Sequence, residues 1–278
     1  MSSARSVILH ADDVGMCHGA NQAFLQLFRA GRIDCGSVMV PCPWFPEIAR
    51  EAVADPSLDL GVHLTLTSEW VGYRWRPLTG RAPGLTDTEG FFPRNVPALR
   101  EGLDVAAAAA EMRAQLETAL AAGIDVTHLD AHMGAAMVPE LLHATRALAA
   151  EFRLPLLLPR RIATYLGALN MGPAAAAAYA APDSPIDAFA MTLGHPEGGA
   201  ETAYRAMLEG VEPGLTYVAM HPTLAGEITA ITAHHPRQDP RWRIEEAALF
   251  QSGLPDQWLA AAGIGRTGMR ALRDRLRA

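Results

Sequence analysis

The chain has 278 residues, half of them hydrophobic and 19% charged, so it can bury a large core. Its formal net charge of −7 argues against a nucleic-acid surface or an anionic membrane as a partner. No apolar run reaches the ~18 residues of a membrane span, the N-terminus lacks a signal-peptide segment, and the three cysteines cannot all pair. We therefore expect a cytoplasmic protein with free thiols.

Short apolar runs alternate with stretches of helical periodicity along most of the chain. The runs with strand character are 6–11, 36–41, 59–66, 125–133, 154–159, 187–193 and 215–222. The helical stretches are 18–31, 46–54, 105–121, 139–152, 200–208, 240–251 and 266–277. This alternation predicts an α/β protein.

Two segments break the alternation. Residues 68–104 contain Pro and Gly and are too long for a plain connector, so we expect an excursion over the site. Residues 160–186 contain several prolines and a run of five alanines, and they predict no definite element. Neither segment reads as a domain linker, so residues 1–278 predict a single (β/α) barrel with about seven strands. A doubly wound open sheet is the alternative, but no GxGxxG motif follows the first strand to bind a dinucleotide.

Asp12 and Asp13 form a carboxylate pair where the first predicted strand ends. Adjacent carboxylates repel each other unless a cation or a shared proton relieves them. The pair could instead cap the following helix, because acidic pairs are common at turns. The carboxyl ends of barrel strands carry the active site, however, so both aspartates are candidate site residues.

Histidines mark the ends of two further strands. His128, Asp130 and His132 alternate along the predicted strand 125–133, so they should share one face. Polar groups on an apolar strand are costly to bury without partners, and a metal ion provides such a partner. His132 lies nearest the strand end and is the better ligand, while His128 and Asp130 would orient it. His63, in GVHLTL, is a second candidate ligand, although a lone histidine there is more often a hydrogen-bonded core residue.

His221 ends the last predicted strand, in the sequence MHP. At a strand end it would face the same mouth, where a histidine can serve as general acid or base. It could equally be a structural histidine before Pro222. The remaining histidines are expected to take no part in the chemistry: His10, His18, His143, His195, His234 and His235.

One aspartate with His63 and His132 is the ligand set of a hydrolase that uses a single divalent metal ion. Such a set leaves coordination positions open for water and a substrate oxygen. It suits Zn²⁺, while Mg²⁺, Mn²⁺ or Co²⁺ fit a site completed by water. No G-x-S-x-G elbow or Cys-His arrangement competes for the role.

Taken together, these motifs resemble the YdjC-like carbohydrate deacetylases, which are distantly similar to NodB-type polysaccharide deacetylases. The resemblance extends from residue 6 to about residue 250, with breaks in register in 68–104 and 160–186. It rests on five pieces in order: ADDVG, GANQAFLQLFRAGRIDCGSVMV, GVHLTL, the helix with Glu111 and Gln115 followed by THLDAH, and MHP. It implies a distorted TIM-type barrel.

The resemblance also implies roles for five residues. Asp13, His63 and His132 match the metal ligands, Asp12 the catalytic base and His221 the general acid. The implied reaction is hydrolysis of an N-acetyl group on an amino sugar, an oligosaccharide or glycolipid head group, with release of acetate. Here the segment after THLDA reads HMGAA, whereas many members have a run richer in histidine, so contacts to chitin oligosaccharides do not transfer.

Other functions remain open at this stage. A metallohydrolase could act on another amide or an ester, although a phosphoesterase usually needs two metals and more ligands. A degenerate barrel could bind sugars without catalysis, but it should then have lost a ligand or the base. The oligomeric state is not visible in the sequence, and a homodimer is the default for a soluble oligomer.

Overall fold

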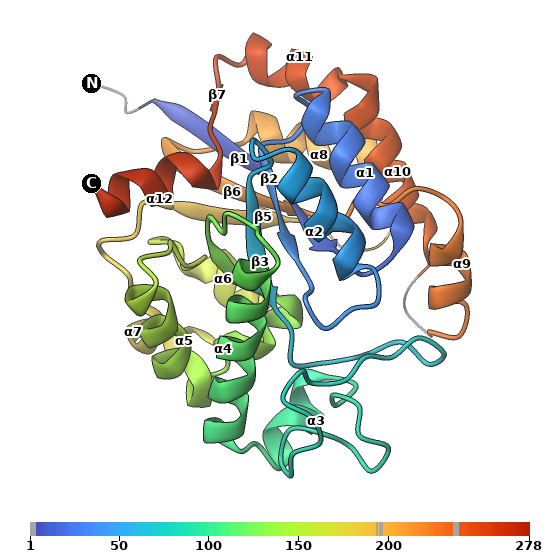
Figure 1. Cartoon of the computed structure of the whole chain (residues 1–278). Helices are drawn as coiled ribbons and strands as arrows, with labels where there is room; N and C mark the ends of the chain where they lie inside the picture. The colour runs from blue at the N-terminus through green and yellow to red at the C-terminus, as the bar shows by residue number, and fades with distance from the viewer. Residues whose placement is uncertain (1–3, 193, 195–196, 236–238) are drawn as a thin grey trace.

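The computed structural model describes residues 4–192, 194, 197–235 and 239–278 (Figure 1). Leu193, the last residue of the predicted strand 187–193, and His195 lie outside this part. Within it, no helix has both the length and the apolar character needed to cross a bilayer. Cys17, Cys35 and Cys42 are all buried and unpaired, which agrees with free thiols.

The centre of the molecule is a parallel β-sheet (Figure 1). In the described residues its strands are β1 (Arg5–Val14), β2 (Cys35–Val38), β3 (Leu60–Leu64), β4 (Leu129–Ala131), β5 (Ala188–Met191), β6 (Gly214–Met220) and β7 (Gly265–Arg266). The order across the sheet is β4-β3-β2-β1-β6-β5, and β7 pairs with the first residues of β1. Both faces of β1 are buried, with Leu9 in one apolar cluster and Ile8 in another, as is usual for parallel strands.

Residues 156–161 lie between the two edge strands β4 and β5 and contact both of them, which closes the sheet toward a barrel. Leu156 forms an isolated parallel bridge with Leu129 of β4. Farther along, the amides of Arg160 and Arg161 donate to carbonyls at residues 186 and 187, just before β5. The expected distorted TIM-type (β/α) barrel is therefore confirmed, and the doubly wound open sheet is not found.

The prediction of a strand at 154–159 is wrong. Only Leu156 pairs in ladder fashion within this segment. Pro155 and Pro159 carry no amide hydrogen, so they cannot donate to a neighbouring strand, and the ladder is limited to the single bridge at Leu156. The predicted strand at 125–133 is also too long, because β4 holds only three residues.

Helices surround the sheet (Figure 1). They are α1 (His18–Arg29), α2 (Phe45–Ala54), α3 (Val96–Glu101), α4 (Val105–Ala121), α5 (Pro139–Glu151), α6 (Ala163–Ala168), α7 (Ala176–Tyr179), α8 (Gly199–Glu209), α9 (Glu227–Thr232), α10 (Arg241–Ser252), α11 (Leu254–Ala261) and α12 (Met269–Arg277). The described residues also contain two 3₁₀ segments, η1 (His132–Met137) and η2 (Pro173–Ala175). The sequence predicted the longer helices, whereas α3, α6, α7, α9 and α11 are short and were not expected.

Helix α4 holds the long segment after β3 in place. Asp104 caps the helix, since its side chain accepts hydrogen bonds from the amides of Ala106 and Ala107. On the buried face, Gln115 bonds both the amide and the carbonyl of Thr65. One turn earlier, Glu111 accepts from the amide and hydroxyl of Thr79. The pair noted one turn apart in the sequence therefore fixes the chain that leaves β3.

Aromatic residues anchor the same segment, which has no helix or strand between residues 65 and 95 and lies with α3 at the lower edge of Figure 1. Trp70, Trp75 and Phe92 are fully buried. The Trp75 indole donates to the carbonyl of Thr67. These three rings serve packing, whereas Tyr73 lines an open cleft at the mouth of the barrel.

Candidate metal centre and active site

A bulge near the end of β1 aims the two aspartates. The pairing of β1 with β2 shifts register between Ala11 and Val14, and Asp13 has a left-handed backbone with φ of 61°. In a regular strand Asp12 and Asp13 would point to opposite faces. The bulge redirects the chain, at a cost of ~1 kcal/mol that aspartate tolerates better than most residues. As a result, Asp13 faces His63 and His132, whereas Asp12 faces His10 and His221.

Asp13, His63 and His132, which we call the outer trio, come together as predicted. Asp13 Oδ1 lies 3.0 Å from His132 Nδ1 and 3.5 Å from His63 Nε2. One ligand atom from each residue lies within 4.8 Å of the others, and all three side chains are buried. Three segments far apart in the sequence thus supply one carboxylate and two imidazoles to one point.

His132 reaches this point in a different way from the one predicted. Strand β4 ends at Ala131, and His132 opens the 3₁₀ segment η1. Met133 and Gly134 then take positive φ angles of 52° and 68°, which turn the chain sharply. His132 therefore follows the strand instead of ending it, but Ala131 is still extended, and Asp130 and His132 both lie beside His63 as the alternation predicted.

Asp130 orients His63. Its Oδ1 lies 2.9 Å from His63 Nδ1, while its Oδ2 accepts hydrogen bonds from the hydroxyls of Ser37 (2.9 Å) and Tyr217 (3.2 Å). A carboxylate beside Nδ1 attracts the ring proton to that nitrogen and leaves the Nε2 lone pair free toward Asp13. Carboxylate–histidine pairs of this kind orient ligands in metal sites.

Two charged residues of the site were missed by the sequence analysis. Glu69 lies 3.0 Å from His132 Nε2, and Arg243 of α10 lies 2.7 Å from Asp13 Oδ2. Both side chains are buried. Glu69 follows β3 within an irregular segment, and Arg243 is 230 residues from its partner in sequence. No local pattern marks either residue as part of a site.

The electrostatic field at the outer trio favours positive charge. Burial lowers the pKa of His132, but the carboxylates of Glu69 and Asp13 outweigh burial and raise it to about 9. His63 likewise has a pKa well above its ordinary value, because Asp130 and Asp13 outweigh burial. Burial raises the pKa of Asp13, yet Arg243 and His132 hold it well below the ordinary value. A donor set that stabilises added positive charge fits a divalent cation.

Asp12 and His221 lie beside the outer trio. Asp12 Oδ2 is 3.7 Å from His221 Nε2. The His221 amide donates to Glu246 (2.8 Å), and its ring packs edge-on against Trp242. His221 Nδ1 is buried and has no hydrogen-bond partner among the described residues. Burial lowers the pKa of His221 to about 4, so the ring is neutral at neutral pH and must receive a proton before it can donate one.

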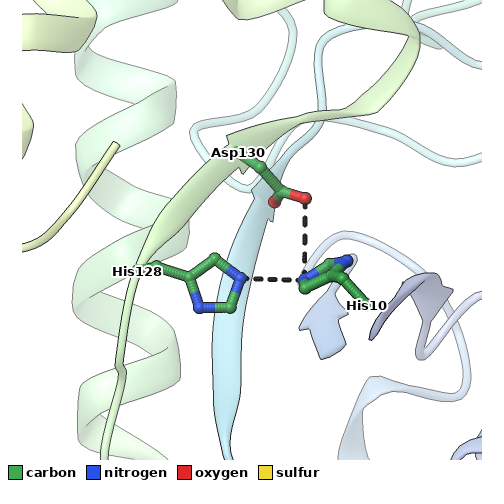
Figure 2. A group of neighbouring side chains, drawn as sticks. All are labelled: His10, His128 and Asp130. Carbon is green, nitrogen blue, oxygen red and sulfur yellow. Dashed lines mark hydrogen bonds and ion pairs between the residues drawn. The ribbon is translucent and has the colours of Figure 1, made fainter. Parts of the chain in front are cut away.

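A second group of the same composition consists of His10, His128 and Asp130, and we call it the inner trio (Figure 2). His10 Nε2 is 2.8 Å from His128 Nε2 and 3.9 Å from Asp130 Oδ2. His10 Nδ1 is 2.7 Å from Asp12 Oδ1. His10 was expected to take no part, but residues 10 and 12 share a strand face, and that spacing could have indicated the contact.

The inner trio explains the glycine of the GVHLTL motif. A Cβ added to Gly61 would lie 2.5 Å from Nε2 of His128, closer than real carbon contacts allow. The His128 ring therefore lies flat against the backbone of β3 only because residue 61 has no side chain. Its Nδ1 is 2.9 Å from the hydroxyl of Thr127, which donates to Asp59.

Curated relatives of this chain carry one common description. Over 162 residues it is 39% identical to a carbohydrate deacetylase of Thermus thermophilus, covering 58% of this chain and 56% of the relative. Over 129 residues it is 37% identical to carbohydrate deacetylase 1 of Listeria innocua, covering 45% and 50%. These matches span about half the length of the relatives. A longer match, 24% identical over 241 residues, covers 86% of this chain and 89% of a carbohydrate deacetylase of Thermoanaerobacter pseudethanolicus.

A solved structure shares the fold. It is a crystal structure from Enterococcus faecalis V583, described as that of a cellobiose-phosphate cleavage protein. It superposes with a TM-score of 0.74 at 21% identity, over 97% of this chain and 99% of the other. At that identity the likeness concerns architecture alone. A family model described as YdjC-like protein matches residues 6–261, so the chain belongs to the YdjC-like protein family.

Proposed function

We propose that this protein hydrolyses the N-acetyl group of an amino-sugar substrate with the help of one divalent metal ion and releases acetate. One observation carries the proposal. The outer trio converges at the mouth of the barrel, and Asp12 stands beside it with Oδ2 toward His221. The description of the curated relatives as carbohydrate deacetylases supports the choice of substrate class.

Asp13, His63 and His132 would hold the ion, since their donor atoms already lie within 4.8 Å of one another. Two imidazoles and a carboxylate suit Zn²⁺, and Mg²⁺ fits if water completes the site. When bound, the ion would lower the pKa of a water molecule and polarise the amide carbonyl. Glu69 and Asp130 would keep the two imidazoles in register, because each lies about 3 Å from the other ring nitrogen.

Asp12 would act as the general base. The water oxygen bonds to the acetyl carbon, and Asp12 Oδ2 takes the water proton while Oδ1 stays against His10. His221 Nε2, 3.7 Å from Asp12 Oδ2, then takes up this proton and passes it to the sugar nitrogen as the C–N bond breaks. The second water proton stays on the acetic acid, which ionises in solvent. Acetate and a free amine leave. The low pKa of His221 makes it a strong acid once protonated.

The decisive experiment measures acetate release from a panel of N-acetylated sugars, with and without a chelator. We expect release that the chelator abolishes and added Zn²⁺ or Mg²⁺ restores. Asp12→Asn should lower kcat by roughly 10²–10⁴-fold, the range for loss of a general base, while the metal content stays unchanged. The matched control is His143→Asn, an exposed histidine of α5, which should keep both metal and turnover.

Three results would reject the proposal. Full turnover in Asp12→Asn would show that Asp12 is not the base. Failure to release acetate from any sugar, with metal bound, would favour another amide or ester as substrate. Sugar binding without any turnover would favour a non-catalytic role.

A further inference from the structure

Hydrogen bonds run in series from Asp12, through both histidines of the inner trio, to Asp59 just before β3. Asp12 Oδ1 lies 2.7 Å from His10 Nδ1, and His10 Nε2 lies 2.8 Å from His128 Nε2 (Figure 2). His128 Nδ1 lies 2.9 Å from the Thr127 hydroxyl, which donates to Asp59 Oδ1 at 2.6 Å. We call these five residues the histidine network. All of them except Asp12 are buried, so water does not supply their partners.

The far end of the histidine network fixes the direction of its hydrogen bonds. Asp59 accepts at both oxygens, from the Thr127 hydroxyl and from the Arg270 amide (2.8 Å). A hydroxyl group has one hydrogen, so Thr127 can only accept from His128, which must carry a proton on Nδ1. Burial and His10 lower the pKa of His128 to about 3, so this ring is neutral at neutral pH and its Nε2 is a bare acceptor. His10 must therefore donate from its own Nε2.

The other end of the histidine network then needs one more proton. With a hydrogen on Nε2 alone, His10 would aim the lone pair of Nδ1 at Asp12 Oδ1, and two acceptors do not lie 2.7 Å apart without a proton between them. The surroundings favour this proton on the ring. Asp130 Oδ2 lies 3.9 Å from His10 Nε2, and the Tyr217 ring lies over the His10 ring with centroids 4.7 Å apart. A carboxylate and an aromatic face both stabilise a cation.

We propose that His10 is a positively charged positioning residue, protonated on both ring nitrogens, and that Thr127 and His128 maintain this state by fixing the direction of the network. The inference rests on the proposed function, in which Asp12 is the base, and it assigns different tasks to the two oxygens of Asp12. Oδ1 accepts from the charged N–H group of His10, which makes it a weak proton acceptor. Oδ2, 3.7 Å from His221 Nε2, remains the oxygen that takes the proton from water.

Ring ¹⁵N chemical shifts test the protonation of His10 separately from turnover, because a bare imidazole nitrogen resonates far downfield of a protonated one. The full chain with ¹⁵N-labelled histidine rings is measured at neutral pH, with and without Zn²⁺. Asp59 is ionised there, although burial raises its pKa. Couplings to the ring hydrogens tell Nδ1 from Nε2, and loss of signals in His10→Phe identifies His10. We expect two protonated nitrogens on His10, and on His128 a proton at Nδ1 only.

Thr127 allows a matched pair of variants. Thr127→Val removes the acceptor of His128 Nδ1 at nearly constant shape, so the His128 proton can move to Nε2 and the direction of the network reverses. His10 then accepts at Nε2 and should show a bare nitrogen there, with its one proton toward Asp12. Thr127→Ser keeps the hydroxyl group and should give the wild-type spectrum.

Acetate release provides the second readout. His10→Phe should lower kcat roughly 10–100-fold and leave KM unchanged, because Asp12 loses the group that holds Oδ1 while the substrate contacts stay. Thr127→Val should lower kcat less, since a ring N–H group still faces Oδ1.

The outcomes separate this inference from the proposed function. In the wild type, a bare Nδ1 on His10 would place the proton on Asp12, and a bare Nε2 would reverse the network, and either result overturns the inference. A His10 spectrum that is unchanged in Thr127→Val, or a full kcat in His10→Phe, also overturns it. Two protonated nitrogens on His10 that depend on the Thr127 hydroxyl, in a protein that releases no acetate, support the charged His10 and reject the deacetylase.

Discussion

The outer and inner trios contain the same residue types, two histidines and one aspartate, and both are buried in one barrel. They differ in what their ring nitrogens face. In the inner trio His10 lies between Asp12 and His128, and His128 lies between His10 and the Thr127 hydroxyl. The two Nε2 atoms thus face each other at 2.8 Å, and the far nitrogen of His128 meets a hydroxyl group instead of a carboxylate.

The outer trio is arranged differently. The facing atoms of Asp13, His63 and His132 converge on one another, while Asp130 and Glu69 lie at the far nitrogens of the two rings. Each imidazole therefore has a carboxylate at its far nitrogen, and its other nitrogen faces Asp13. Second partners on the outside of a ligand set are what a metal site needs.

The electrostatic field separates the trios further. Burial and the neighbouring His10 lower the pKa of His128 to about 3, whereas Glu69 and Asp13 outweigh burial and raise that of His132 to about 9. The local field therefore disfavours a positive charge at His128 and favours one at His132. If the outer trio holds the ion, as we propose, then the direction of the ring nitrogens and the sign of the local field decide between the two clusters, because their composition is the same.

Asp130 is a member of the inner trio and also contacts His63 of the outer trio. We therefore expect its replacement to have the largest effect of the variants considered. In Asp130→Asn the carboxylate that orients His63 is lost, and we expect the affinity for Zn²⁺ to fall roughly 10–100-fold. Competition with a chromogenic chelator measures the change. Asp256→Asn, a half-buried aspartate of α11 that pairs with Arg32 and Arg266, serves as control. An unchanged affinity in Asp130→Asn would contradict the orienting role.

Gly61→Ala should break the inner trio without touching a ligand. The added methyl group would collide with the His128 ring, and overpacking of this kind costs ~1–3 kcal/mol of unfolding free energy. Urea denaturation measures the loss. At Gly102 a Cβ would meet nothing within 4 Å, so Gly102→Ala should stay near the wild-type value. Equal stability of the two variants would show that His128 has room to move.

A further difference between the trios is a pH dependence at His128. The folded-state pKa of about 3 lies below the unfolded value near 6.5, so the stability that neutral His128 contributes is present above pH 6.5 and lost as pH falls toward 3. The metal-free wild-type protein should lose its stability advantage over His128→Asn by ~1.4 kcal/mol per pH unit between pH 6 and 4. Denaturation at several pH values measures it. A difference that stays constant with pH would mean that His128 is charged in the folded protein.

Much of this arrangement was predictable because it depends on strand ends. The positions of Asp13, His63 and His132 follow from three apolar runs whose carboxyl ends meet at one face. Glu69 and Arg243 were not predictable, because an irregular segment and a distant helix bring them to the site and neither has a periodic pattern. The strand expected at 154–159 failed because apolar content alone does not reveal where proline removes the pairing amides.

The number of metal ions per chain tests the central claim most directly. After equilibration with Zn²⁺ and removal of the excess, elemental analysis should give one ion per chain in the wild type, one in His128→Asn and essentially none in Asp13→Asn. Two ions per wild-type chain, or an ion that is lost in His128→Asn and kept in Asp13→Asn, would contradict the assignment of the cation to the outer trio.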